Sequence, residues 1–101
     1  MKISILTPER EVFNGLVTSV KVPGTRGEFQ ILNNHAPIVS SLDAGFIHVV
    51  TAQGEYRYFD DESGEIKTAA EPGRSLRFKI AGGFVEVLRD EVSLLVHGVR
   101  E

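Results

Sequence analysis

The stretch LVTSVKVPGTRGEFQIL, residues 16–32, has the pattern of two short strands joined by a turn. Apolar and polar residues alternate along its first half, a period of two that is typical of a half-buried strand. Pro23-Gly24 and Gly27 then supply the geometry of a tight corner, because proline fixes its own φ and glycine accepts positive φ. Phe29 and Ile31 follow, two residues apart and therefore on one face of the second strand. In the first strand, the two expected faces are Leu16, Thr18, Val20 and Val22 on one side and Val17, Ser19 and Lys21 on the other.

The same period of two recurs along the chain, between pairs of residues that favour turns. These pairs are Asn14-Gly15, Pro23-Gly24, Ala44-Gly45, Gln53-Gly54, Ser63-Gly64, Pro72-Gly73 and Gly82-Gly83. Strands spaced about 8–12 residues apart, with turns between them, are typical of a β-sandwich or barrel. The best helical window, residues 37–42, is too short to form a significant helix. We therefore expect one all-β domain over residues 1–101, with an extended hairpin over residues 56–76 that packs Tyr56, Tyr58 and Ile66 at its base.

The composition excludes several classes of protein. The chain has 101 residues and no cysteine, so disulfide and thiolate chemistry are absent. Lys and Arg total 11 against 14 Asp and Glu, and no basic stripe is visible in the sequence, so we expect no nucleic-acid partner. No segment approaches the roughly 20 apolar residues that span a bilayer, and the apolar run before Pro8 is too short for a signal peptide. We expect a soluble cytosolic protein that can attach to a membrane-bound assembly without inserting into the membrane.

No group of residues has the pattern of a catalytic or metal site. The three histidines, His35, His48 and His97, lack the i, i+4 spacing of a zinc site. The acidic run Asp60-Asp61-Glu62 lacks the spacing of a calcium loop, so we interpret it as a solvated hairpin tip. The glycine pair at residues 24 and 27 lacks the Lys and the helix of a phosphate loop, and no serine has a paired base. We therefore expect a structural or interaction protein with no catalytic residue, metal or cofactor.

Six motifs occur in an order and spacing that, taken together, are specific. They are T-P-E-x-x-V-F-x-G at 7–15, V-x-V-P-G-x-x-G-E-F at 20–29, I-L-x-N-H-A-P at 31–37, L-x-x-G at 42–45, G-G-F-V-E-V at 82–87 and V-S-L-L-V at 92–96. With these motifs the chain resembles the N-terminal β-domain of the epsilon subunit of F-type ATP synthase, the equivalent of the mitochondrial delta subunit. The resemblance covers nearly the whole chain except residues 56–76.

The resemblance implies a flattened ten-stranded β-sandwich that links the gamma shaft to the membrane c-ring, turns with both, and carries out no bond chemistry. It implies that ion translocation is coupled to ATP synthesis or hydrolysis through this rotor, at the cytoplasmic face of the bacterial inner membrane. By position, it assigns Arg26, Gly27 and Glu28 to the c-ring contact. It assigns the gamma contact to His35, Ala36, Pro37, Ile38 and Val39.

Two alternatives remain open at the level of sequence. Pro37 biases Ala36 toward an extended backbone, so the loop is stiff, and His35 either bonds the loop carbonyls or belongs to a docking surface. The whole protein could also be a free-standing sandwich that uses its long hairpin to hold a peptide or a sugar. Because little follows residue 97, we expect the short form of the family, without the C-terminal helical hairpin that inhibits ATP hydrolysis in other members.

Overall fold

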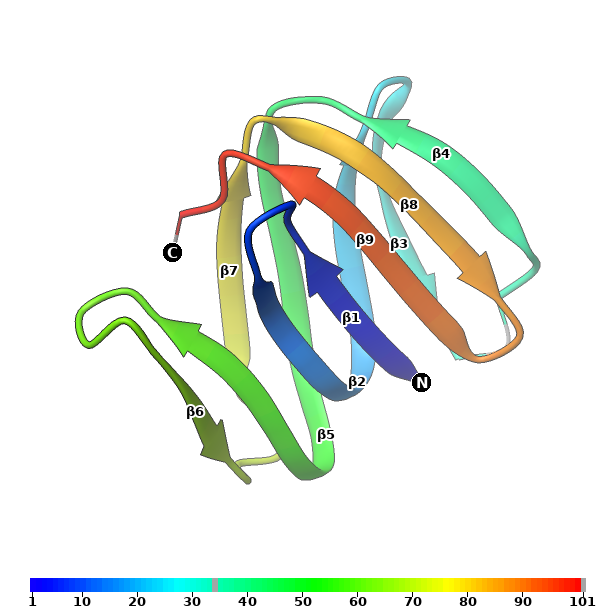
Figure 1. Ribbon diagram of the computed structural model, residues 1–101. Helices are drawn as coiled ribbons and strands as arrows, with labels where there is room; N and C mark the ends of the chain where they lie inside the picture. Colours follow the sequence, from blue (N-terminus) through cyan, green and yellow to red (C-terminus); the bar gives the residue numbers. More distant parts are fainter. Residues whose placement is uncertain (34, 101) are drawn as a thin grey trace.

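The computed structural model describes residues 1–33 and 35–100, and every regular element in these residues is a β-strand (Figure 1). The expected all-β sandwich is confirmed, but the described residues form nine strands rather than ten. One reason is that Gln53-Gly54, an expected corner, lies inside a single long strand. The strands are β1 Lys2–Leu6, β2 Glu11–Gly24, β3 Gly27–Leu32, β4 Ile38–Leu42, β5 Gly45–Asp60, β6 Glu65–Ala69, β7 Ser75–Ile80, β8 Gly82–Leu88 and β9 Glu91–His97.

Two long strands, β2 and β5, pass from one layer of the sandwich to the other. The half of β2 around Phe13 pairs with the half of β5 around Tyr58, with β1 beside this half of β2 and β6 beside this half of β5. From β1 the layer continues through β9 and β8 to β4. The other halves of β2 and β5 pair with each other through Val20 and Val49, flanked by β3 and β7. We call the layer of β4, β8, β9, β1 and β6 the first layer and the layer of β3 and β7 the second. Figure 1 shows the second layer behind the first.

The bend in β2 and β5 follows from irregular pairing and close packing. The register shifts between Val17 and Ser19, which is a β-bulge that reverses the faces of the strand. The expected alternation is therefore wrong for its first two members: Leu16, 46% exposed, and Thr18 face solvent, whereas Val17 is buried together with Val20. Gly15 lies against Tyr56 so closely that any side chain there would overlap it. The bulge and the close Gly15–Tyr56 contact, and not turns, therefore account for the irregular pairing in the middle of β2 and β5.

The core lies between the layers and is built from alternate residues of the strands. Phe13 stacks on Tyr56 with ring centroids 5.5 Å apart and meets Phe78 edge-on at 6.0 Å. Each fully buried large apolar side chain contributes about 1.5–3 kcal/mol relative to an exposed one. Phe29 and Ile31 face the core together as expected. The buried apolar residues are Met1, Ile3, Ile5, Val12, Phe13, Val17, Val20, Val22, Ile31, Leu42, Ile47, Val49, Tyr56, Phe78, Ile80, Val85, Val87, Val92, Leu94 and Val96.

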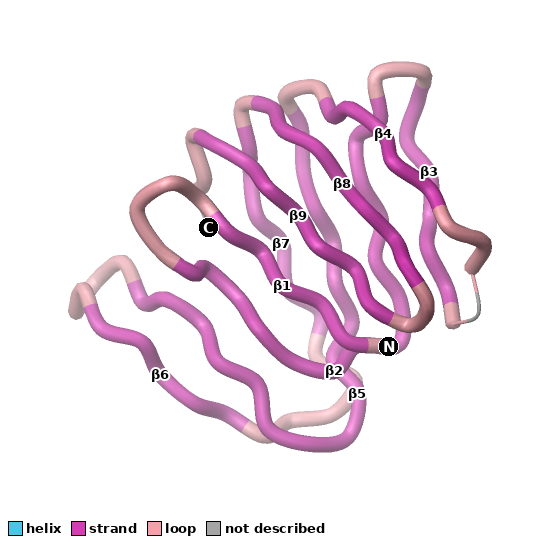
Figure 2. Tube along the Cα trace, turned by 45° about the vertical axis from the view of Figure 1, so that its right-hand side comes forward, coloured by secondary structure: helices cyan, strands magenta, loops and turns pink. Residues whose placement is uncertain are grey.

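The β5–β6 hairpin lies at the periphery of the molecule, as Figure 2 shows. Tyr56 is buried and Tyr58 packs partly against the core, as expected for the base of the hairpin. Ile66 was expected to pack there too, and this expectation is wrong because Ile66 is 56% exposed. It pairs with Phe59 near the tip, and no described layer covers β6, whose residues 65–68 are all exposed. The hairpin is therefore held mainly by its own strand pairing.

Candidate functional site

The residues expected at the c-ring contact lie at the β2–β3 turn. Arg26 is in the turn, and Gly27 and Glu28 are the first two residues of β3. All three are exposed. Gly27 has φ +123°, a conformation that side-chain-bearing residues rarely adopt. The turn is tied to β4, because the Thr25 N–H donates to the Ser41 carbonyl at 3.1 Å. The turn is thus rigidly placed beside β4, although the two are distant in sequence.

The residues expected at the gamma contact lie between β3 and β4 and at the start of β4. The His35 N–H donates to the Leu32 carbonyl at 3.2 Å, and His35 Nδ1 lies 2.8 Å from the Ala36 carbonyl oxygen. A carbonyl only accepts, so Nδ1 is the donor in this contact. This contact supports the loop-fastening role and leaves the other ring nitrogen for a partner. Asn34 of the N-H-A-P motif lies outside the described residues.

A groove between β3 and β4 brings the β2–β3 turn together with Ile38 and Val39, two of the five residues expected at the gamma contact. Among the described strands, β3 pairs with β2 alone, and β4 meets β2 only where Leu42 pairs with Gly24. The two strands therefore diverge from this junction and leave backbone N–H and C=O groups unpaired along facing edges. The space between them is about 540 Å³. We call it the β3–β4 groove; it is lined by Gly24, Thr25, Arg26, Gly27, Glu28, Phe29, Ile38, Val39, Ser40 and Ser41.

Val39 stands between this groove and a second hollow. The second hollow, about 230 Å³, is lined by Pro37, Ile38 and Val39 together with residues 86–88 of β8. Val39 is 71% exposed, the largest value among the exposed large apolar side chains of the described residues. His35 and Ala36 are not among the lining residues of either hollow. The structure thus joins Ile38 and Val39 to the β2–β3 turn and leaves the loop residues to one side.

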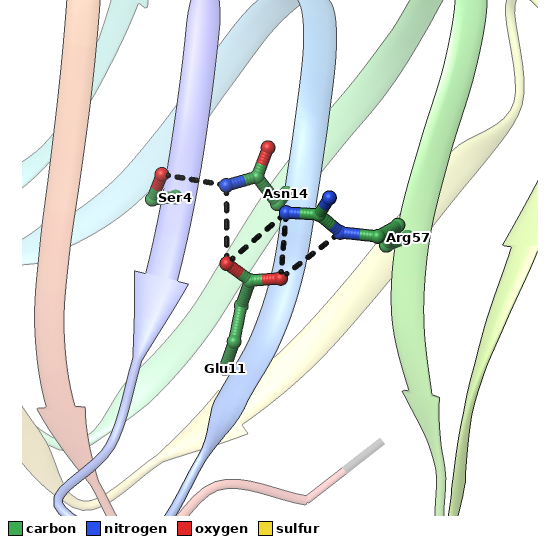
Figure 3. Close-up of polar contacts among 4 residues, drawn as sticks. All are labelled: Ser4, Glu11, Asn14 and Arg57. Carbon is green, nitrogen blue, oxygen red and sulfur yellow. Dashed lines mark hydrogen bonds and ion pairs between the residues drawn. The ribbon is translucent and has the colours of Figure 1, made fainter.

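A polar network on the outer face of the first layer was not expected from the sequence. Asn14 Nδ2 donates to Ser4 Oγ and to Glu11 Oε2, both at 3.1 Å, and Arg57 forms an ion pair with Glu11 at 3.2 Å (Figure 3). The network ties β1, β2 and β5 together just before the hairpin. Arg57 is half exposed, so the ion pair contributes about 0.2–1 kcal/mol. The sequence alone does not reveal this network, because it depends on the strand register that pairs Asn14 with Ser4 on one side and with Arg57 on the other.

The ionisable side chains of the described residues form structural contacts. Within residues 1–33 and 35–100, no three His, Cys, Asp or Glu side chains are placed to hold a metal ion. The perturbed groups have structural partners: a hydrogen bond from Lys67 holds the pKa of Asp60 below its ordinary value, and the Tyr56 hydroxyl raises the pKa of Arg74. No helix long and apolar enough to cross a membrane occurs in the described part of the chain.

Comparison with known proteins identifies relatives of this architecture. The family model "ATP synthase, Delta/Epsilon chain, beta-sandwich domain" matches residues 1–60. The chain is similar to the chloroplastic ATP synthase epsilon chain of Cyanidioschyzon merolae, with 31% identity over 100% of this chain, and to the epsilon chain of Leptospira interrogans, with 33% identity over 97%. It spans 62% of the length of each of these two relatives. Its fold is that of a chain in the central stalk and c-ring structure of the Tetrahymena thermophila mitochondrial ATP synthase, with a TM-score of 0.67 and 18% identity over all of this chain and 66% of that one.

Proposed function

We propose, because this chain belongs to the ATP synthase delta/epsilon family through its β-sandwich domain, that it is a non-catalytic central-stalk subunit of F-type ATP synthase. In this role it links the gamma subunit to the c-ring and couples ion translocation to ATP synthesis or hydrolysis. The same proposal takes residues 1–101 as one epsilon-type domain. The observation that carries it is the family match over the residues that build the β3–β4 groove.

The architecture suits a part that transmits force and leaves chemistry to its neighbours. A core shared by two layers and two strands that run through both makes the sandwich one stiff block. The groove is built from strand backbone, and the Thr25–Ser41 hydrogen bonds hold its closed end. A surface that is ordered before binding loses little conformational entropy on docking, so more of the contact energy remains as affinity.

We assign the gamma contact to Ile38 and Val39 in the groove wall and to His35, Ala36 and Pro37 beside it. Truncating an apolar anchor at an interface often costs more than about 1 kcal/mol, or about fivefold in Kd. We expect this loss for Ile38→Ala and a smaller loss for His35→Ala, measured by titrating purified gamma subunit against each variant. Thermal unfolding checks that both variants are folded. Affinity for gamma that is unaltered in both variants would refute the assignment.

We assign the c-ring contact to Arg26, Gly27 and Glu28. Glu28 is exposed and makes only a loose ion pair with Lys21 at 4.0 Å, so its carboxylate is available to polar or basic loop groups. An exposed charge contact is worth about 0.2–1 kcal/mol and is screened by salt. Glu28→Lys should weaken retention on the gamma–c-ring assembly more at low salt than at high salt. Glu55→Lys, the same change at an exposed site on β5, is the control, and equal retention of both variants at every salt concentration contradicts the assignment.

The proposed location is the cytoplasmic face of the bacterial inner membrane, where partner subunits hold the protein peripherally. A pull-down from membranes tests the location and the function together. Recovery of gamma or c subunits with the wild-type chain is the expected result. Recovery of the chain alone, with a bound peptide or sugar, would instead support a free-standing binding module.

A further inference from the structure

The outer face of the second layer gathers basic side chains that are far apart in the sequence. Lys21 of β2 pairs with His48 of β5, and His48 pairs on its other side with Arg77 of β7. Directly opposed residues project from the same face of a sheet, so these three side chains form one row across three strands. Lys79 lies two residues beyond Arg77 on the same face, and its backbone forms an isolated antiparallel β-bridge with Arg100. We call Lys21, His48, Arg77, Lys79 and Arg100 the basic face.

Burial confirms that this row points away from the core. In β5 the neighbours of His48, Ile47 and Val49, are fully buried, and in β7 Phe78 and Ile80 are buried between exposed residues. Lys21 is about half exposed. The basic row therefore lies on the solvent side of the second layer, and the buried apolar residues of the same strands lie on the opposite side.

The charge of this face is opposite to that of the whole chain. The basic face holds four Lys and Arg residues, and among the described residues on this side the carboxylate beside them is Glu28, paired loosely with Lys21. The whole chain has a net charge of −3. Acidic groups are concentrated elsewhere, including the hairpin tip at Asp60-Asp61-Glu62. No basic stripe is visible in the linear sequence because strand pairing creates it.

Arg77 is held in a geometry that suits a carboxylate. Its guanidinium lies over the Phe46 ring, 4.4 Å from the ring centroid. Stacking fixes the plane of the guanidinium and leaves its N–H edges free to form paired hydrogen bonds with a carboxylate. Phe46 itself is 37% exposed, so it offers an apolar contact beside the charge. Together they form a fixed recognition element and not merely a diffuse positive potential.

We propose that the basic face binds an acidic, partly apolar segment of a partner protein. Its charge is complementary to such a segment, and the Arg77–Phe46 pair matches a carboxylate next to an apolar side chain. Single-stranded nucleic acid is less suitable, because bases stack on exposed aromatic rings and the Phe46 ring is covered by Arg77. An anionic bilayer is also less suitable, because the four Lys and Arg of this face reach only the lower end of the about 4–8 clustered basic residues that lipid binding uses, and the rest of this chain is acidic. This face shares no residue with the β3–β4 groove, which it adjoins through the loose Lys21–Glu28 ion pair, so the inference goes beyond the proposed function.

The test is a titration of the isotope-labelled chain with poly-L-glutamate of about 15 residues, in which binding is measured from the NMR chemical shifts of the backbone amides. The expected shifts fall on β2, β5 and β7 around Lys21, His48 and Arg77, and they diminish with salt. Lys21→Gln/Arg77→Gln should weaken binding at least about tenfold. The control Lys2→Gln/Arg89→Gln, which removes the same charge from the other layer, should change Kd less than about twofold.

Three outcomes overturn the proposal. The first is an equal loss of affinity in the test and control pairs, which would mean that only total charge matters. The second is binding of oligo-uridine or of vesicles containing phosphatidylglycerol more tightly than poly-L-glutamate, each measured in the same titration. The third is amide shifts located away from the basic face. Thermal unfolding of both double variants shows whether loss of binding reflects loss of fold.

Discussion

The β3–β4 groove and the β5–β6 hairpin are both exposed at the margins of the sandwich, but they are built in opposite ways. The groove has unpaired strand edges and an exposed apolar residue, Val39, and each of its two strands carries a buried core residue, Ile31 in β3 and Leu42 in β4. The hairpin projects further and β6 also has an open edge, because among the described strands it pairs with β5 alone, but charged side chains at its tip are paired with each other: Lys67 and Asp60 form an ion pair at 2.7 Å, and Ser63 donates to the same carboxylate. We therefore propose that docking depends on an exposed apolar side chain carried by strands of the core, and not on how far an element projects.

The largest expected effect is on the free energy of unfolding when one isoleucine is truncated in each of the two regions. Ile31→Ala removes a fully buried side chain behind the groove and should lower the free energy of unfolding by about 2–5 kcal/mol. Ile66→Ala removes an exposed side chain from the hairpin and should change it by less than about 0.5 kcal/mol. Urea unfolding of both variants measures the two values. Similar losses in the two variants would show that the hairpin is part of the core.

A smaller effect is expected from two glycines with positive φ. An alanine Cβ at Gly27 or Gly64 would meet no atom within 4 Å, so only backbone strain distinguishes them. Gly64 has φ +71°, near the left-handed region that other residues can occupy, whereas Gly27 has φ +123°. Gly27→Ala should therefore cost about 1–3 kcal/mol and Gly64→Ala about 1 kcal/mol or less. A larger loss for Gly64→Ala in thermal unfolding would reverse the contrast between the rigid turn and the tolerant tip.

The smallest effect is a local response of the hairpin to acid. The Lys67 hydrogen bond, with a further bond from the Glu62 N–H, lowers the pKa of Asp60 below its ordinary value. A carboxylate with a lowered pKa stabilises the folded hairpin above its unfolded pKa, near 4, and this stabilisation is lost as pH falls through the folded value. The Glu62 amide, which donates to Asp60 at 3.1 Å, should shift on titration below about pH 4. The Thr25 amide in the groove should not move, and concerted movement of both would mean that acid loosens the whole sandwich.

Local sequence patterns predicted the strands but not the way they are joined. The period of two placed Phe29 and Ile31 correctly, because the faces of a single regular strand depend only on its own sequence. Leu16 was placed on the wrong face because a bulge is decided by the partner strand. Gln53-Gly54 was taken for a corner because glycine favours both turns and bends within strands.

The surfaces were less accessible from sequence than the strands. The β2–β3 turn and residues 35–39 were identified as candidates, but the meeting of the turn with Ile38 and Val39 in one groove depends on the Gly24–Leu42 pairing across the sandwich. The Ser4–Glu11–Asn14–Arg57 network and the basic face likewise join residues from three or more strands. Each depends on the register of non-local strand pairs, which no stretch of the sequence contains.

Site-specific cross-linking from Val39 and Ile66 tests most directly whether the groove, and not the hairpin, is the docking surface. The chain has no cysteine, so Val39→Cys and Ile66→Cys each carry one labelling site for a benzophenone maleimide. Both side chains are exposed, so labelling should be equal. After assembly on membranes and irradiation, Val39→Cys should form an adduct with the gamma subunit and Ile66→Cys should form none. An adduct from Ile66→Cys alone, or none from Val39→Cys, would contradict the assignment of docking to the β3–β4 groove.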